Sequence, residues 1–275
     1  MPFLVLPATV LVLTLLVAPM AMLFKISLNQ YSPTELMVEA MSGENYLQAI
    51  SDPYYQNVLV TTVVVALLCT LICVILAFPA AYWLARMQSR WKSTVTVLTL
   101  FPLLVGGVVR AAGWIALLGN EGALNALFRL FGSTEPVQMM YTPAAVVVGT
   151  SAVVLPYMIL TLSSVIESIS RQTEEAAANL GARPLTVFLR VLLPQAAPGV
   201  LAGSVLVFIL SMNAYATPVL LGGPSFAMLA PAIYDQFTRA GNWPFGAALA
   251  FMLLTTTLVL TALVSLGITR GLKRA

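Results

Sequence analysis

The sequence contains no histidine and very little charge. Of its 275 residues only 8% are charged and 60% are hydrophobic, and the mean hydropathy is +0.94. A soluble domain carries about a quarter charged residues, so this chain lacks the polar surface that a water-soluble globule needs. The composition excludes that class, and we expect an integral membrane protein whose outer solvent is lipid.

Cysteine is scarce as well. The chain has two, Cys69 and Cys73, four residues apart in an apolar run. Two thiols without histidine or acidic neighbours make a poor metal site. We expect no metal site here, and buried, reduced thiols that pack as small hydrophobic side chains.

The phosphate-binding pattern G-x-x-x-x-G-K-[ST] is absent from the sequence,. The chain therefore lacks the common route to ATP binding, and we expect no catalytic residue and no cofactor bound directly. The net charge of +3 comes from lysines and arginines in connecting segments. It does not indicate nucleic-acid binding.

Long apolar runs are what the sequence does have. A membrane-spanning helix needs about 20 mostly apolar residues, and backbone groups in hydrocarbon must be paired within a helix. Six runs meet or nearly meet that length, and we predict spans at 3–24, 58–85, 93–110, 143–168, 198–221 and 245–269. The fold class is thus an all-α polytopic membrane protein in a single transmembrane domain, 1–275.

Two of these spans need comment. Residues 3–24 carry no charge; the run lacks the basic start of a secretory signal and exceeds its usual apolar length, so we predict a retained membrane helix,. In the third span, Gly106 and Gly107 are expected to bend the helix, and Arg110 to mark its polar end.

The positive charges predict the orientation, because lysine and arginine accumulate on the cytoplasmic side. Placing segments 86–92, 170–197 and 270–275 on one side collects nine of the 13 cationic residues there. The other side of the membrane then has only four cationic residues, which are Lys25, Arg110, Arg129 and Arg239. We therefore expect a multi-pass protein of a bacterial inner membrane with both termini cytoplasmic.

The outer connections differ in character. Segment 25–57 is rich in acids, and segment 222–244, rich in glycine and proline, is predicted to be an ordered loop. Segment 111–142 contains apolar residues at i, i+3, i+4 and i+7, which predicts a short helix on the membrane surface or over the bundle. Those residues are Leu124, Leu127, Phe128 and Phe131.

A polar stretch lies between the apolar fourth and fifth spans. Its sequence is "EEAAANLGARPLTVFLRVLLP" (174–194). Thr173 is a plausible N-cap, and Glu174 and Glu175 favour the first turn of a helix. Ala176, Ala177 and Ala178 are strong helix formers without bulk.

The second half of the stretch predicts another helix. Gly181 suits a left-handed turn, Pro184 can open a helix at its first turn, and Pro194 is expected to end the unit. Between the prolines an apolar stripe is expected from Leu185, Phe188, Leu189 and Leu192. The whole predicts two short helices joined at a glycine, which either dock in another protein's groove or form a simple solvated hairpin.

This stretch resembles the EAA loop of binding-protein-dependent ABC importer permeases. The family pattern is E-A-A, three residues, G, nine residues, I-x-L-P. Here Glu175-Ala176-Ala177 precede Gly181, and Val191-Leu192-Leu193-Pro194 follow, with valine in place of isoleucine as the one departure. The resemblance implies a type I importer permease fold with a cytoplasmic coupling helix between helices four and five.

Softer signals extend the likeness along the chain. The stretches 44–62, 101–128, 220–224 and 242–250 resemble the spermidine/putrescine permease subfamily, the first of its two unlike permease types. The resemblance implies four kinds of partner: a second permease subunit, two ATPase subunits that bind ATP and magnesium, a periplasmic binding protein, and the lipid bilayer. No nucleic acid is expected.

The same resemblance assigns roles. Coupling to an ATPase subunit falls on residues of the loop, which are Glu174, Glu175, Ala176, Ala177, Gly181, Arg183, Pro184, Leu185, Phe188 and Pro194. Polar or aromatic residues at membrane depth usually face the bundle or a water-filled path, and our candidates to line a path are Tyr157, Ser211, Asn213, Tyr215, Thr217, Asp235 and Trp243. Gly199 and Gly203 form a G-x-x-x-G pair that permits close helix approach.

The cargo stays open at this point. A polyamine should prefer carboxylates or aromatic faces, yet no acid lies in mid-span. Either selectivity resides in the binding protein, or the cargo is another small solute such as an amino-acid derivative or opine. A secondary transporter would want ionisable residues at mid-membrane and an internal repeat, neither of which is clear, and a non-transporting scaffold would leave the polar residues of span five unexplained.

Overall fold

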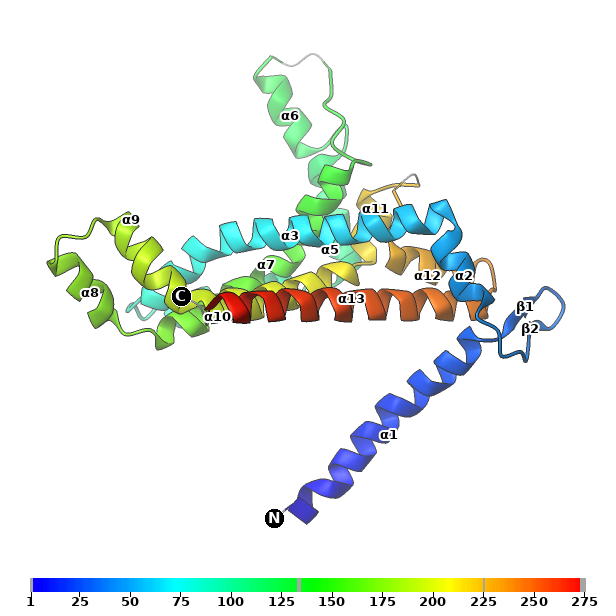
Figure 1. The fold of residues 1–275 in the computed structure, drawn as a ribbon. Helices are drawn as coiled ribbons and strands as arrows, with labels where there is room; N and C mark the ends of the chain where they lie inside the picture. The colour runs from blue at the N-terminus through cyan, green and yellow to red at the C-terminus, as the bar shows by residue number, and fades with distance from the viewer. Residues whose placement is uncertain (1, 133–134, 225, 273–275) are drawn as a thin grey trace. The chain divides into compact units, whose positions relative to one another are not determined.

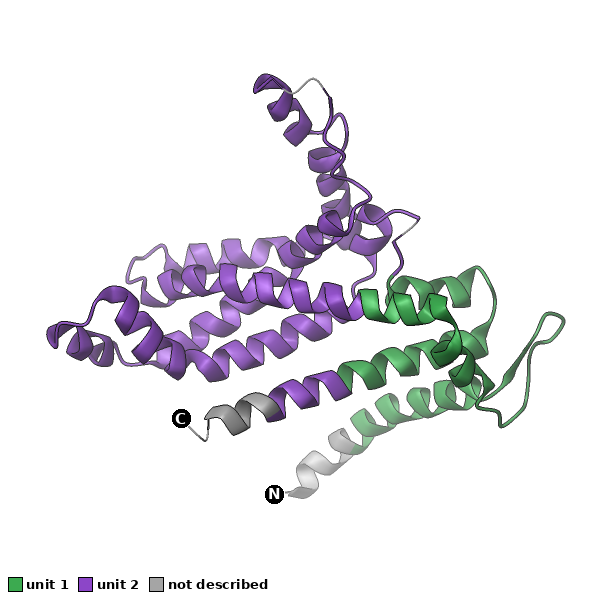
Figure 2. Cartoon of the chain, turned by 45° about the horizontal axis from the view of Figure 1, so that its top comes forward, with its two compact units in different colours: residues 1–61, 228–258 green, residues 62–227, 259–275 purple. Residues whose placement is uncertain are grey.

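The computed structural model describes residues 2–132, 135–224 and 226–272. Within them the chain is almost entirely helical and divides into two compact units, residues 1–61 with 228–258 and residues 62–227 with 259–275 (Figures 1 and 2). Five helices are long and apolar enough to span a membrane, and a sixth candidate is a pair of helices bent by 93°. This supports the predicted class of polytopic membrane protein.

The first unit begins with α1 (Pro2–Ser27), which the sequence predicts as a membrane helix. A small hairpin of β1 (Gln30–Ser32) and β2 (Leu36–Val38) and the helix α2 (Glu44–Ser51) follow. Their connection is held by Asn45, a buried side chain whose amide donates to two backbone carbonyls, those of Ser27 and Asn29, at 2.8 Å each.

The same unit contains α12 (Leu229–Thr238), the start of α3 (Pro53–Arg86) and the first part of α13 (Trp243–Leu272). Tyr55 packs edge-on against Phe245 with ring centroids 4.8 Å apart, and Gln236 donates to the Tyr55 hydroxyl. The prediction of a loop over 222–244 is thus wrong in part. Leu229 and Ala232 are buried on one face of α12. This local amphipathic pattern favours a helix despite the surrounding glycines and prolines.

The second unit holds the remaining helices. These are α4 (Lys92–Leu104), α5 (Gly107–Leu118), α6 (Ala123–Leu130), α7 (Pro143–Ser168), α8 (Arg171–Asn179), α9 (Pro184–Val187), the π-helical segment η1 (Phe188–Leu192), α10 (Leu193–Met212) and α11 (Ala216–Leu221). Its core is formed by α3, α7, η1 and α10, and includes fully buried Met158, Leu162 and Ile166. Cys69 and Cys73 are free and buried, as predicted.

Glycines set the distance between α7 and α10. A Cβ on Gly199 would lie 2.8 Å from Cβ of Val165, and one on Gly203 would lie 2.4 Å from Sδ of Met158. The two helices therefore pack more closely than any other residue would allow, which confirms the close approach predicted from G-x-x-x-G.

The bend expected at Gly106 and Gly107 is confirmed, and it breaks the third span predicted over 93–110 into two helices. The helix stops at Leu104, Val105 is extended, and α5 starts anew at Gly107. Two glycines offer the freedom to turn, and the guanidinium of Arg110 donates to the carbonyl of Pro102 across the break. Arg110 lies inside the new helix, where it ties the bend instead of ending a span. The short helix predicted inside 111–142 is confirmed as α6.

Candidate functional site: a polar elbow and a helical pocket

Residues 170–197, which we call the elbow, begin with α8. Ser170 is its N-cap, and the serine hydroxyl accepts from the backbone N–H of Gln172. Thr173, predicted as the cap, lies inside the helix and donates its hydroxyl to the carbonyl of Ser170. Serine and threonine both cap helices well. Ser170 is the N-cap because α8 begins at Arg171, soon after α7 ends at Ser168.

The helix α8 ends in the turn that the sequence predicts. Gly181 has φ of +84°, the left-handed conformation that favours glycine,. The N–H of Ala182 donates to Ala177 O at 3.1 Å and that of Gly181 to Ala178 O at 2.9 Å. This pair of bonds is the Schellman motif, which satisfies the last carbonyls of a helix.

After the turn, Pro184 opens α9 at its first turn, also as predicted. The prediction that Pro194 ends the unit is wrong, because helical structure continues without interruption from Pro184 to Met212. Proline lacks an N–H and its ring clashes with the carbonyl four residues before. The π-helical segment η1 ends at Leu192, two residues before Pro194. The wider turn of a π-helix is one way for a helix to accommodate a proline.

The apolar stripe of the elbow is only half buried. Leu192 is 1% exposed and the Phe188 ring meets Phe78 edge-on at 4.9 Å, whereas Leu185 is 68% and Leu189 49% exposed. One part of the stripe thus fastens the elbow to the core. Leu185 and Leu189 stay free to contact another molecule.

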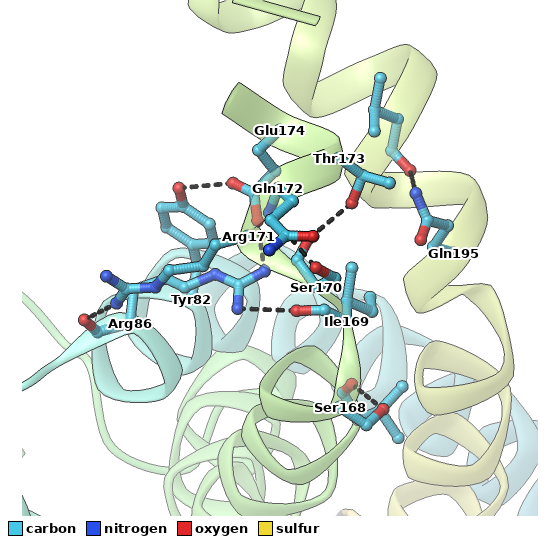
Figure 3. A network of polar contacts seen from close by, with 12 residues as sticks. Tyr82, Arg86, Ser168, Ile169, Ser170, Arg171, Gln172, Thr173, Glu174 and Gln195 are labelled. Atoms are coloured by element: carbon cyan, nitrogen blue, oxygen red, sulfur yellow. Dashed lines mark hydrogen bonds and ion pairs between the residues drawn. The ribbon is translucent and has the colours of Figure 1, made fainter. Parts of the chain in front are cut away.

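A polar cluster ties the start of α8 to the end of α3 (Figure 3). Glu174 accepts from the Tyr82 hydroxyl at 2.9 Å and forms an ion pair with Arg86. The two charged side chains are 13% and 15% exposed. The sequence interpretation placed Glu174 in the coupling surface and missed Tyr82 and Arg86, because their only signal was a basic residue at the end of an apolar run.

Beside this cluster the elbow encloses a hollow of about 390 Å³. It is lined by Glu175, Ala178, Ala182 and Pro184 together with Tyr82, Glu174, Val187, Phe188 and Leu192. The predicted coupling residues Glu175 and Pro184 therefore face one concave surface. Arg183 is the N-cap of α9, at the bend between the two short helices.

A second hollow, of about 210 Å³, lies among α5, α7, α10 and α11. Three candidates for a path, Tyr157, Tyr215 and Thr217, line it together. Among the described residues that line this hollow, Arg110 is the only one with a formal charge. The remaining lining residues are Gly107, Thr150, Val153, Val154, Leu210, Ala214 and Ala216.

The other path candidates lie elsewhere. Ser211 is fully buried, and Asn213 is exposed, caps α10 and donates its amide to Ile209 O. Asp235 and Trp243 belong to the first unit, where Asp235 pairs with Arg239 at 3.3 Å and Trp243 stacks edge-on with Phe237. Their role in a path stays a prediction. No group of metal-binding side chains is found among the described residues.

The arrangement of these helices is that of ABC importer permeases. The structure superposes with a TM-score of 0.80 on a chain of a bacterial ABC transporter for the acidic polysaccharide alginate, over 97% of this chain and 94% of the other, at 16% identity. A second structure of an alginate ABC transporter, solved in complex with an alginate-bound periplasmic protein, gives 0.75 over 95% and 91%, at 15% identity. The fold is therefore the one that these transporter chains share.

Sequence comparison gives the family. Residues 140–268 match the model of the binding-protein-dependent transport system inner membrane component. The chain is 33% identical over 211 residues to the spermidine/putrescine permease protein PotB of Escherichia coli, covering 76% of each. It is 34% identical to the molybdenum permease protein ModB of Mycobacterium bovis, covering 80% of each. The chain belongs to this family of inner-membrane permeases and is a permease subunit of an ABC importer.

Proposed function

We propose that this chain forms half of the translocation path of an ATP-driven importer and takes its driving force from an ATPase subunit that docks on the elbow. The supporting observation is the shape of α8. It contributes no buried side chain to its own chain, ends in a sharp glycine turn, and presents a concave surface beside Glu175. A short helix with no buried side chain of its own is suited to dock in a groove of a partner protein,.

The partners follow from the same proposal. A second permease subunit completes the path, two ATPase subunits hold ATP and magnesium, and a periplasmic binding protein delivers cargo. This chain binds no cofactor directly. The distribution of the cationic residues supports a cytoplasmic location for the elbow and both termini.

A polyamine is the first candidate for the cargo, supported by the PotB relatives. Tyr157 and Tyr215 line the second hollow, and aromatic side chains can bind a cation. Selectivity for the polycation would then reside mainly in the binding protein.

A different small solute, one that carries a carboxylate such as an amino-acid derivative or opine, is the second candidate. It is favoured by Arg110, whose guanidinium supplies the one formal charge of that hollow, since arginine pairs readily with carboxylates,. The similar identity to ModB, named for a different cargo, shows that relatives at this distance differ in what they carry.

Two measurements test the proposal. Affinity purification of the tagged chain from its own membranes is expected to bring down an ATPase subunit and a second permease, and recovery of the chain alone would contradict it. Calorimetric titration of the binding protein encoded beside it with spermidine, putrescine and a panel of amino-acid derivatives decides the cargo.

A further inference from the structure

The helix α8 is attached to the rest of its unit mainly by polar contacts. None of its nine residues, Arg171–Asn179, is buried. Apolar burial, which holds most helices of a domain in place, is therefore missing here. A force applied to α8 by another protein reaches the core through the backbone at its two ends and through whatever side-chain bonds it makes.

Those bonds converge on Arg86. Its guanidinium pairs with Glu174 through one terminal nitrogen and donates to Ile169 O at 3.0 Å through the other. Ile169 is the C-cap of α7. A single side chain thus joins the last turn of α3, the end of α7 and the first turn of α8 (Figure 3).

Two further contacts close the cluster. Tyr82, one turn before Arg86 on α3, donates to the second oxygen of Glu174 at 2.9 Å. Arg171 donates to the backbone carbonyl of Arg86, at the C-terminal end of α3. The charges of the pair match the helix dipoles, since Glu174 lies in the first turn of α8 and Arg86 in the last turn of α3,.

The burial of the cluster makes it firmer than a surface ion pair. Arg86 and Glu174 are 13% and 15% exposed, whereas Lys92 and Glu167, which pair at 2.9 Å in the same unit, are 34% and 43% exposed. A largely desolvated pair is screened less by salt and holds one geometry. Breaking it leaves an uncompensated charge.

We infer that Tyr82, Arg86 and Glu174, here called the Arg86 clamp, are positioning residues that lock α8 to α3 and α7, so that displacement of α8 by the ATPase subunit moves the core helices as one body. The inference rests on the proposed function. It assigns Glu174, which lies at the hollow, to holding α8 in place, and leaves the contact with the partner to the exposed Glu175.

The test uses the complete importer purified with its own ATPase and permease partners and reconstituted in liposomes. ATP hydrolysis is measured with and without the binding protein and its cargo for E174A, R86M and the double variant. Alanine keeps the helical propensity of α8. The matched controls are E167A and K92M, which break the more exposed pair that does not involve α8.

In the expected result each clamp variant keeps its ATPase subunit and its basal hydrolysis but loses stimulation roughly fivefold or more, which is the lower end of measured coupling between sites. The double variant loses no more than the worse single one, because both remove the same interaction. The controls keep their stimulation.

Three results would overturn the clamp. These are stimulation kept by E174A and R86M, additive losses in the double variant, or loss of the ATPase subunit from the purified complex, which would assign the pair to docking. Failure of the proposed function is distinguishable, because the wild-type complex itself would then show no ATPase subunit or no stimulation.

Discussion

Glu174 and Glu175 are adjacent in the sequence and differ in their side-chain contacts. Both carboxylates line the hollow of the elbow, but Glu174 is mostly buried by its bonds to Tyr82 and Arg86, whereas Glu175 is exposed. Two carboxylates that composition treats alike therefore serve different contacts. The first is expected to hold the elbow and the second to meet a partner.

Glu175→Lys is expected to abolish transport while the chain stays in the membrane in normal amount, because the reversed charge repels whatever the carboxylate attracts. Uptake of the cargo by intact cells, with an immunoblot of the membrane fraction, measures both quantities. Glu35→Lys makes the same charge change in the first unit and should transport normally. Wild-type uptake by the Glu175→Lys variant would contradict the coupling role of this residue.

Gly181 permits a second prediction at this scale. A Cβ there would meet no atom within 4 Å, so space is available and only the backbone conformation, φ of +84°, resists substitution. Gly181→Val should cost roughly 1–2 kcal/mol in the turn and lower binding-protein-stimulated ATP hydrolysis. Gly181→Asn, which tolerates the left-handed region, should retain most of it; equal loss in both would show that strain is not the cause.

Among the described elements, α7 and α10 make the most extensive contact with each other. Gly199 lies against Cβ and both methyl groups of Val165, a stiff β-branched side chain that cannot swing away,. Gly203 faces the flexible end of Met158. The first glycine is thus the stricter requirement.

Gly199→Val is expected to destabilise the chain by roughly 1–3 kcal/mol through overpacking. Thermal unfolding of the purified protein in detergent measures the effect as a lowered Tm. Gly113, inside α5, has no atom within 4 Å of a built Cβ, so Gly113→Val is the matched control and should leave Tm unchanged. Equal values for the two variants would refute the close approach.

The bent α4–α5 pair and the helical rod from Pro184 to Met212 show how elements depart from simple spans. Both segments contain prolines and glycines, but these residues affect the helix differently in the two. Gly106 and Gly107 break a helix whose next part turns away, whereas Pro194 stays within a helix that widens into a π turn. Local propensity marks such positions, and only the packing of neighbouring segments selects the outcome.

At the scale of the whole molecule, the predicted orientation is open to direct test. Met41, 89% exposed in the first unit, and Gln88, exposed between α3 and α4, should lie on opposite sides of the membrane. A membrane-impermeant maleimide is expected to label Met41→Cys in intact spheroplasts and Gln88→Cys only after permeabilisation. The native cysteines are buried and provide the unlabelled background. Labelling of Gln88→Cys from outside would reverse the topology.

The sequence by itself determined the membrane class, most of the spans, the glycine turn of the elbow and the family, since these depend on apolar length, backbone conformation and a fixed spacing of residues. The tertiary structure decided the size of the bend after Leu104, which is 93°, the continuous helix through Pro194 and the pairing of Glu174 with Tyr82 and Arg86. The pairing of Glu174 joins residues about 90 positions apart. No local pattern encodes such a contact, because it arises only when the ends of separate helices come together.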